Sequence, residues 1–185
     1  MTTKPSLHTL IELKRDCNVT LIPSGEKLKL LQGDYVIVEQ ALGGSFTVKT
    51  ERGYLALINA SDADALGFDN KTEKEAPAEV GAFNLEKVVE KLKTVFDPEI
   101  PVNVVDLGLI YACEAHPLPG GGHRVEIKMS MTAPGCGMGD VLKEDARGKV
   151  ETVAGVTDVD IEIVWEPAWD PGRMSEAARL QLGML

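Results

Sequence analysis

The sequence predicts an α+β fold in which a small all-β N-terminal domain, residues 1–68, precedes a C-terminal α-β-β-α-β-α sandwich, residues 80–185. Three observations support this prediction. Short β-branched runs separated by turn residues fill the first third of the chain. A polar stretch at 69–79 interrupts the pattern. Helical stripes and alternating strands then follow one another. We expect the helices of the second domain to cover one face of a small mixed sheet.

The N-terminal domain is predicted from short apolar runs, each bounded by glycine, proline or acidic turn residues. These runs lie at 19–22, 28–31, 35–38, 46–48 and 54–58. Their length and spacing favour hairpins that curl into a small barrel-like sheet. Ser61 to Gly67 then reads as a capped helical turn closed by glycine. The acids in that turn favour a solvated cap over a metal site, because a helix N-terminus attracts negative charge.

The stretch 69–79 contains mixed charges and a proline but no large apolar residue. It cannot bury enough surface to order itself, so we predict that it is a linker between two domains.

The C-terminal domain is expected to begin with a helix capped by Asn84, whose apolar stripe runs from Leu85 to Phe96 and ends before Pro98. A strand is predicted at Leu107 to Glu114. A second strand, from His123 to Met131, alternates strictly between apolar and polar residues. One face of the sheet should therefore meet water.

A second helix is predicted from Met138 to Val153, closed by Gly155. Gly148 within it costs about 1 kcal/mol relative to alanine, which favours close packing there or a frayed last turn. The next strand, 156–165, implies a right-handed crossover to a parallel neighbour. A short helix, Met174 to Leu182, completes the domain. The two tryptophans, Trp165 and Trp169, are expected to pack this helix onto the sheet.

Composition excludes several classes of function. The chain has 185 residues, 44% of them hydrophobic, and a net charge of -10. The negative charge argues against nucleic acid or an anionic membrane as a partner. We find no signal sequence and no apolar run near the roughly 20 residues that span a bilayer, so we expect a cytoplasmic protein. Its three cysteines are far apart and odd in number, which favours reduced thiols.

Cys136 is the main candidate for chemistry. It lies in the glycine-rich turn Met131 to Asp140, between a predicted strand and a predicted helix. The N-terminus of a helix favours a negative charge and can lower the pKa of a thiol below its free value of about 8.5. A glycine-rich turn with a small buried cysteine explains this stretch equally well.

The other candidates are weaker. His116 and His123 flank a proline and glycine loop and could bind a metal, although a solvated loop is favoured. Cys113 is expected in the core of a strand, and Cys17 could be buried or exposed. His123 should lie more than about 20 Å from Cys136 at about 3.3 Å per strand residue. No histidine base is therefore expected near the thiol.

Three stretches resemble the signatures of one family, the small metal-sulfur cluster biosynthesis domain. They are Asp97 to Tyr111, Thr132 to Cys136, and Trp165 to Leu180. The family includes cytosolic iron-sulfur assembly proteins of eukaryotes and PaaD-type subunits of bacterial oxygenase clusters. The N-terminal region is similar to the extra domain that marks the SufT branch. The segments that support this second similarity are Arg15–Asp16, Ile22 to Gly25, Leu31 to Gly33, and Gln40 to Val48. The chain departs from the family at Gly137, where proline is common, so its turn is less constrained.

The resemblance implies a non-enzymatic maturation factor for iron-sulfur proteins. Its partners would be SUF-type assembly proteins and apo-protein clients, and Cys136 would be its functional thiol. Thr132 could hydrogen-bond the turn. Asp97, Glu99 and Asp106 could act as oxygen ligands or as a docking surface, although a carboxylate beside a thiol raises the thiol pKa. Asp97 could equally be a helix-end turn residue, and Asp106 could cap a turn.

The small number of candidate ligands predicts that any bound iron or cluster is held only transiently. An iron-sulfur cluster normally takes four protein ligands, and only Cys136 lies in a candidate site. The sequence therefore predicts a transient cluster or iron, held with the help of a partner, a small thiol or a carboxylate. A homodimer that presents two Cys136 turns across a two-fold axis is a further expectation. The alternative function is a thiol enzyme or redox sensor that uses Cys136 as a nucleophile.

Overall fold

A computed structural model describes residues 7–68, 82–134 and 137–184. The described residues form two compact units. The first contains 7–68 together with Pro98–Pro101, and the second contains the remainder. The predicted linker, 69–79, lies outside the described residues, as does Cys136. The domain boundaries therefore stay a prediction.

The first unit contains one six-stranded sheet in which every pair is antiparallel. The order of the strands across the sheet is β1-β4-β5-β6-β2-β3. Their bounds are β1 Leu10–Glu12, β2 Cys17–Ile22, β3 Lys27–Leu30, β4 Tyr35–Leu42, β5 Ser45–Thr50 and β6 Leu55–Ile58. Five of them match the predicted runs. The sequence pattern missed β1 because only three residues pair and two of them are exposed.

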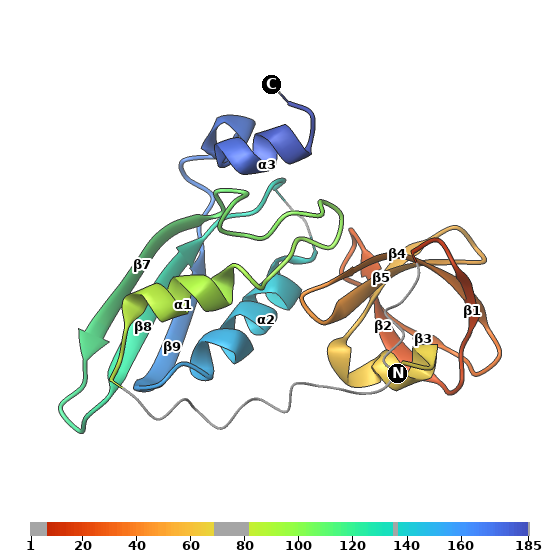
Figure 1. Ribbon diagram of the computed structural model, residues 1–185, viewed down its shortest axis with the longest axis horizontal. Coiled ribbons are helices and arrows are strands. Elements are labelled where there is room, and N and C mark those ends of the chain that lie inside the picture. The colour runs from red at the N-terminus through yellow and green to blue at the C-terminus, as the bar shows by residue number, and fades with distance from the viewer. Residues whose placement is uncertain (1–6, 69–81, 135–136, 185) are drawn as a thin grey trace. The chain divides into compact units, whose positions relative to one another are not determined.

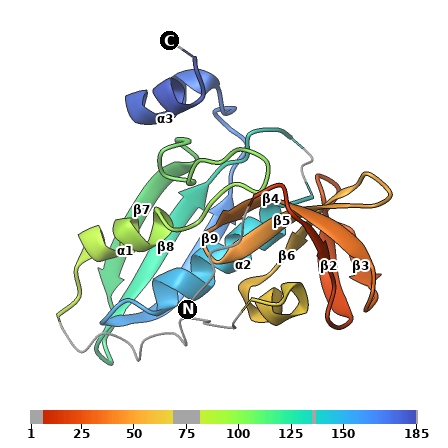
Figure 2. The same ribbon diagram turned by 45° about the vertical axis from the view of Figure 1, so that its right-hand side comes forward.

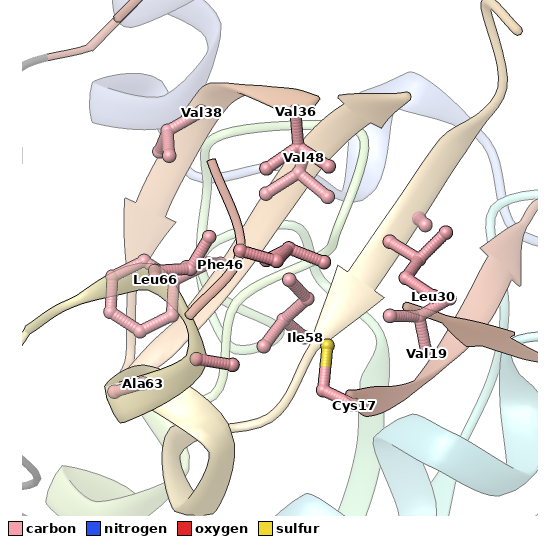
Figure 3. Close-up of a cluster of buried hydrophobic side chains, with 13 residues drawn as sticks. Cys17, Val19, Leu30, Val36, Val38, Phe46, Val48, Ile58, Ala63 and Leu66 are labelled. Atoms are coloured by element: carbon pink, nitrogen blue, oxygen red, sulfur yellow. The ribbon is translucent and has the colours of Figure 1, made fainter. Parts of the chain in front are cut away.

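The core of the first unit is a cluster of buried side chains that the sheet and the 3₁₀ helix Ala60–Leu66 supply together. Figure 3 shows these side chains pointing toward one another, with the sulfur of Cys17 directed into the cluster. Cys17 is therefore a core residue, and its burial raises the pKa of the thiol. The 3₁₀ helix ends at Gly67, in the left-handed conformation that the closing glycine predicted.

An arginine joins two distant segments of the first unit. The guanidinium of Arg15 donates to both carboxylate oxygens of Asp64 at 2.7 Å and to Asp62 at 2.8 Å. This paired geometry raises the pKa of Arg15 above its usual value, chiefly through the hydrogen bond to Asp64. The two acids were predicted to be a solvated cap. They instead form an ion-pair network with a residue 47 to 49 positions earlier in the chain.

The second unit contains a three-stranded mixed sheet in the order β7-β8-β9. Strand β7 pairs antiparallel with β8, and β8 pairs parallel with β9. The elements are α1 Leu85–Leu92, β7 Ile110–Pro117, β8 His123–Met129, α2 Gly139–Glu151, β9 Val156–Ile163 and α3 Glu176–Gln181. A 3₁₀ turn, Pro171–Arg173, precedes α3. The predicted α-β-β-α-β-α order and the α+β fold are confirmed.

Helices α1 and α2 lie together on one face of this sheet, whereas α3 lies beyond its end (Figures 1 and 2). The face under the helices is apolar, since Val125, Ile127 and Ile161 are almost completely buried. The opposite face is charged, and there Arg124 donates to Asp160 at 2.9 Å. Ser130 was expected on the solvated face, but only 1% of its surface is exposed.

Several predicted boundaries are wrong, most of all those of the first helix and of the strand that follows it. The first helix starts at the expected cap, where the Glu86 N–H donates to the Asn84 side chain at 2.8 Å, but it ends at Leu92 and does not reach Phe96. Phe96 instead forms an antiparallel bridge with Asn103. The following strand begins at Ile110 and ends at Pro117, each three residues later than predicted. The preceding apolar residues, including Leu107, are buried in a turn.

Helix α2 continues three residues past Gly148. A Cβ added at Gly148 would meet nothing within 4 Å, so close packing does not explain this glycine. No helix in the described part of the chain is both long and apolar enough to span a membrane.

Candidate functional site

The three sequence stretches that suggested a function meet at one end of the second unit's sheet. The strand register places Ile110, the first residue of β7, opposite Met129, the last residue of β8. Met129 in turn lies beside Ile163, the last residue of β9. The chain leaves β8 at this end and enters α2 at Gly139. The segments before β7, after β8 and after β9 therefore share one end of the sheet.

Two buried methionines anchor the loop between β8 and α2. Met131 is 2% exposed and Met138 is 1% exposed, so both ends of the loop are held in the core. Between them, Ala133 and Pro134 are exposed and Thr132 is half-buried. Gly135 and Cys136 lie outside the described residues. The described part of this loop is therefore buried at its two ends and exposed at Ala133 and Pro134.

Among the described residues, no side chain caps the N-terminus of α2. Met138 is its N-cap residue and makes no capping hydrogen bond. The first amide groups of a helix have no partner within the helix and carry a partial positive charge. The exposed carboxylate of Asp140 in the first turn offsets part of this charge, while the free amide groups remain as donors. Such an end suits a nearby anion, and a thiolate is one candidate.

Asp106 takes part in a local turn. The Asn103 side-chain amide donates to the Asp106 carboxylate at 2.6 Å, and the Asp106 N–H donates back to the Asn103 side chain at 2.9 Å. This arrangement fits the turn-capping alternative that the sequence left open. Sequence reasoning did not single out Asn103. The spacing of two Asx residues three positions apart was the available signal.

The two acids before this turn occupy different environments. Asp97 is buried, and its N–H donates to the carbonyl of Val102 at 3.1 Å. Glu99 is exposed and belongs to Pro98–Pro101, the segment grouped with the first unit. The predicted roles of Asp97, Glu99, Asp106 and Thr132 beside the thiol stay predictions.

The stretch Trp165 to Leu180 packs against the stretch Asp97 to Tyr111. The Trp169 indole donates to the Leu107 carbonyl at 2.8 Å, and the Tyr111 hydroxyl donates to the Pro167 carbonyl at 2.9 Å. The Arg173 guanidinium lies 4.0 Å from the centre of the Tyr111 ring. Trp169 therefore makes a structural contact with the turn before β7, whereas its expected packing of the C-terminal helix onto the sheet stays a prediction.

Gly108 lies where these two stretches approach each other closely. The backbone of Arg173 approaches Gly108 so closely that a Cβ there would overlap the Arg173 carbonyl. Trp165 does not match its prediction, because 46% of its surface is exposed and it does not pack fully onto the sheet.

The remaining candidates lie away from the loop. His123 begins β8, at the opposite end of the strand from Met129, and its ring stacks on Phe83 with centroids 4.1 Å apart. His116 approaches Glu114 and Glu126 at 3.8 and 3.7 Å. Within the described ranges, no group of three or more His, Cys, Asp and Glu side chains could hold a metal ion.

Cys113 is half-buried in β7, where burial raises the pKa of its thiol. Cys113 lies in a strand as predicted, but it is half-buried and not the core residue that was expected. The raised pKa leaves less thiolate at neutral pH, so Cys113 is a poor candidate for a reactive thiol.

Comparison with known proteins identifies relatives of the second unit. Residues 85–163 match the family described as iron-sulfur cluster assembly protein. A Porphyromonas gingivalis protein named Fe-S protein maturation auxiliary factor is 49% identical over 100 residues, which cover 54% of this chain and 91% of that protein.

Two further relatives carry similar names. The Bacillus subtilis Fe-S protein maturation auxiliary factor YitW is 31% identical, with 54% of this chain and 93% of that protein covered. The Staphylococcus aureus factor SufT is 29% identical, with 49% of this chain and 98% of that protein covered. The chain belongs to the iron-sulfur cluster assembly protein family.

Proposed function

We propose that this protein is an auxiliary factor in the maturation of iron-sulfur proteins. It acts with SUF-type assembly proteins and passes iron or a cluster to apo-proteins through the thiolate of Cys136. The family match supports this proposal, because residues 85–163 contain the whole loop between β8 and α2. The names of the relatives support it as well, since they describe maturation factors.

One structural observation carries the proposal: the loop that contains Cys136 connects two buried methionines and ends at an uncapped helix N-terminus. A thiolate is a soft ligand for iron, and the partial positive charge of such an end stabilises it. The exposed middle of the loop allows another protein to approach. In this proposal Thr132, at the start of the loop, hydrogen-bonds the backbone of the turn.

The iron or cluster is cargo in this proposal. A cluster normally takes four protein ligands, and the described residues contain no group of three that could hold a metal. The remaining ligands would come from a second copy, from a carboxylate such as Glu99, from a partner protein or from a small thiol. Each of these gives an exposed and labile site, which suits transfer.

We include in the proposal that the protein is not an enzyme, is cytoplasmic and forms a homodimer. A nucleophilic thiol enzyme needs a base near its cysteine. His123 and His116 both lie toward the end of the sheet opposite the loop, which disfavours that reading.

Complementation tests the proposal. In cells that depend on this factor, Cys136→Ser should abolish rescue, whereas Cys113→Ser should preserve it. The thermal midpoint of Cys136→Ser should stay within a few degrees, because a surface substitution typically costs within about 0.5 kcal/mol. A variant that rescues fully would remove Cys136 from the mechanism.

Anaerobic reconstitution tests the cargo. The protein should be colourless or weakly coloured as isolated, gain visible absorbance with iron and sulfide, and lose it to an apo acceptor. A tightly held cluster that survives Cys136→Ala would contradict both the ligand and the transfer role.

A further inference from the structure

Strand β7 is an edge of the second unit's sheet, because β8 is its neighbour on one side only. Figure 1 shows it as the outer strand of that sheet. Half of the N–H and C=O groups of an edge strand point away from the sheet and can pair with another strand. In the described part of the chain, β8 is the strand to which residues 112–116 are paired. The outward groups of β7 are therefore available.

The two edges of this sheet differ in how they prevent pairing. Edge strands are usually protected by charges, by proline or by short length. Strand β9 carries Asp158, Asp160 and Glu162 on its solvated face. An antiparallel pair of two β9 strands would set carboxylates opposite one another, which is destabilising. Strand β7 spans eight residues, has no lysine or arginine, and has proline only at its end.

The solvated face of β7 is self-complementary in hydrogen bonding, because a carboxylate accepts and an imidazole N–H donates. Along this face Glu114 is followed by His116, and both are accessible, with 68% and 51% of their side-chain surface exposed. A two-fold axis at Ala115 would place each Glu114 opposite the partner subunit's His116. We propose that β7 pairs antiparallel with β7 of a second copy about this axis, which forms a continuous six-stranded sheet.

The alternative registers are less favourable. A two-fold axis perpendicular to the sheet pairs each residue with a residue whose side chain lies on the same face. The axis must therefore pass through a residue position, and alternative registers move it from one residue to the next. An axis at Glu114 sets the two Glu114 carboxylates opposite each other. An axis at Cys113 extends the pairing to Ile110 and Tyr111, where the register with β8 shifts and the C-terminal segment contacts Tyr111.

This pairing defines which surface forms the homodimer interface, and it changes the expected geometry of the dimer. The loop toward α2 leaves β8 at Met129, which lies opposite Ile110. Ile110 is five residues before Ala115. At about 3.4 Å per residue, the two Ile110 ends lie roughly 34 Å apart in the pair. The two loops therefore leave from opposite ends of the joined sheet. Two Cys136 turns would not meet across this axis, in contrast to the arrangement expected from sequence.

The inference rests on the homodimer in the proposed function, but its test measures assembly and needs no maturation activity. In analytical ultracentrifugation the full chain should dimerise as its concentration rises. His116→Glu should raise the dimer Kd by about tenfold or more, because two carboxylate–carboxylate pairs replace two carboxylate–imidazole pairs. Exchanging both residues, Glu114→His with His116→Glu, should restore the dimer. Lys128→Ala removes one positive charge from the same face, on β8, and should have no effect.

Disulfide cross-linking tests the register independently of charge. Directly opposite strand residues have Cα atoms about 4.5 to 5.5 Å apart, which a disulfide can span. In a chain with Cys113→Ser and Cys136→Ser, Ala115→Cys should form a covalent dimer on mild oxidation, and Glu162→Cys on β9 should not.

Native Cys113 lies opposite the partner subunit's Pro117 in this register and should not cross-link to itself. A monomer at all concentrations would overturn the proposal. So would an exchange variant that stays monomeric, or cross-linking through Cys113 in place of Ala115→Cys. If His116→Glu fails to fold, the cross-linking result decides.

Discussion

The ion-pair network around Arg15 in the first unit contrasts with the start of helix α2 in the second unit. In the first unit, polar groups near the chain turns are bonded to one another: Arg15 holds Asp62 and Asp64, and Lys29 holds Asp16 at 2.8 Å. The hydrogen bond with Lys29 is the main cause of the lowered pKa of Asp16. In the second unit, the start of α2 has no side-chain cap and follows a loop with an exposed middle.

This difference separates a structural use of polar groups from a chemical one. A carboxylate that already accepts paired hydrogen bonds has little capacity left for a ligand. An uncapped helix end still has donors to offer. The residues matched by the family, 85–163, include the uncapped end and none of the bonded network around Arg15. We therefore expect substitutions in the first unit to affect stability and those in the loop to affect function.

The largest expected effect is loss of core packing in one unit at a time. Ile58 and Ile161 are fully buried, in the first and second units respectively. Either isoleucine changed to alanine should destabilise its own unit by about 2 to 5 kcal/mol, because it leaves a cavity. Hydrogen exchange should report faster opening in the mutated unit only. Equal acceleration in both units from either variant would show that they unfold together.

A smaller loss of stability is expected when either of two glycines with positive φ is replaced by alanine. Gly108 has φ of 71° and lies against the Arg173 backbone, whereas Gly33 has φ of 91° and open space around its Cα. Gly33→Ala should cost about 1 to 2 kcal/mol through backbone strain alone. Gly108→Ala should cost more and should release the C-terminal segment to proteases. Equal midpoints in thermal melts of the two variants would contradict the close contact.

The cysteines give the next comparison. Cys17→Ser places a hydroxyl in an apolar core and should cost about 1 to 3 kcal/mol. Cys136→Ser should cost within about 0.5 kcal/mol. Denaturant titration measures both.

Alkylation extends this comparison to reactivity. Burial raises the pKa of Cys17 and of Cys113, so less thiolate is present at pH 7 and both should react slowly. The fraction of thiolate, and with it the rate, should increase as the pH rises toward those raised values. Peptide mass spectrometry should find Cys136 modified first. Equal rates at Cys136 and Cys113 would remove the argument for an activated thiolate.

The smallest expected effect is a gain in stability. Gly148 lies inside α2, and a Cβ there would meet nothing within 4 Å. Gly148→Ala should therefore stabilise the second unit by about 1 kcal/mol. Maturation activity should be unchanged, since this position is nine residues beyond the start of the helix. A destabilised variant would show that this helix face is covered in solution.

Local patterns in the sequence determined most of the elements. Strict alternation from His123 onward predicted β8, because side chains on a strand point to opposite faces in turn. Asn84 predicted the start of α1, since its side chain accepts a hydrogen bond that the helix cannot satisfy itself. Short motifs likewise predicted the family, which depends on residue identity at fixed spacing.

The same local patterns failed where buried residues belong to irregular segments. Leu107 and Leu109 are buried in the turn before β7, yet an apolar run of this kind resembles a strand. Val95 and Phe96 continued the helical stripe after the helix had ended. Burial alone does not distinguish these cases, because any segment that contacts the core selects apolar side chains.

Only the tertiary structure decided which distant residues meet. The acids of the 3₁₀ helix pair with Arg15, and the carbonyl of Asp106 accepts a hydrogen bond from the Ser175 N–H at 2.8 Å. The order β7-β8-β9, which makes β7 an edge, was also decided by tertiary structure. Periodicity records which face of an element is buried but not the element that covers it, and contacts between distant segments depend on how the whole chain packs.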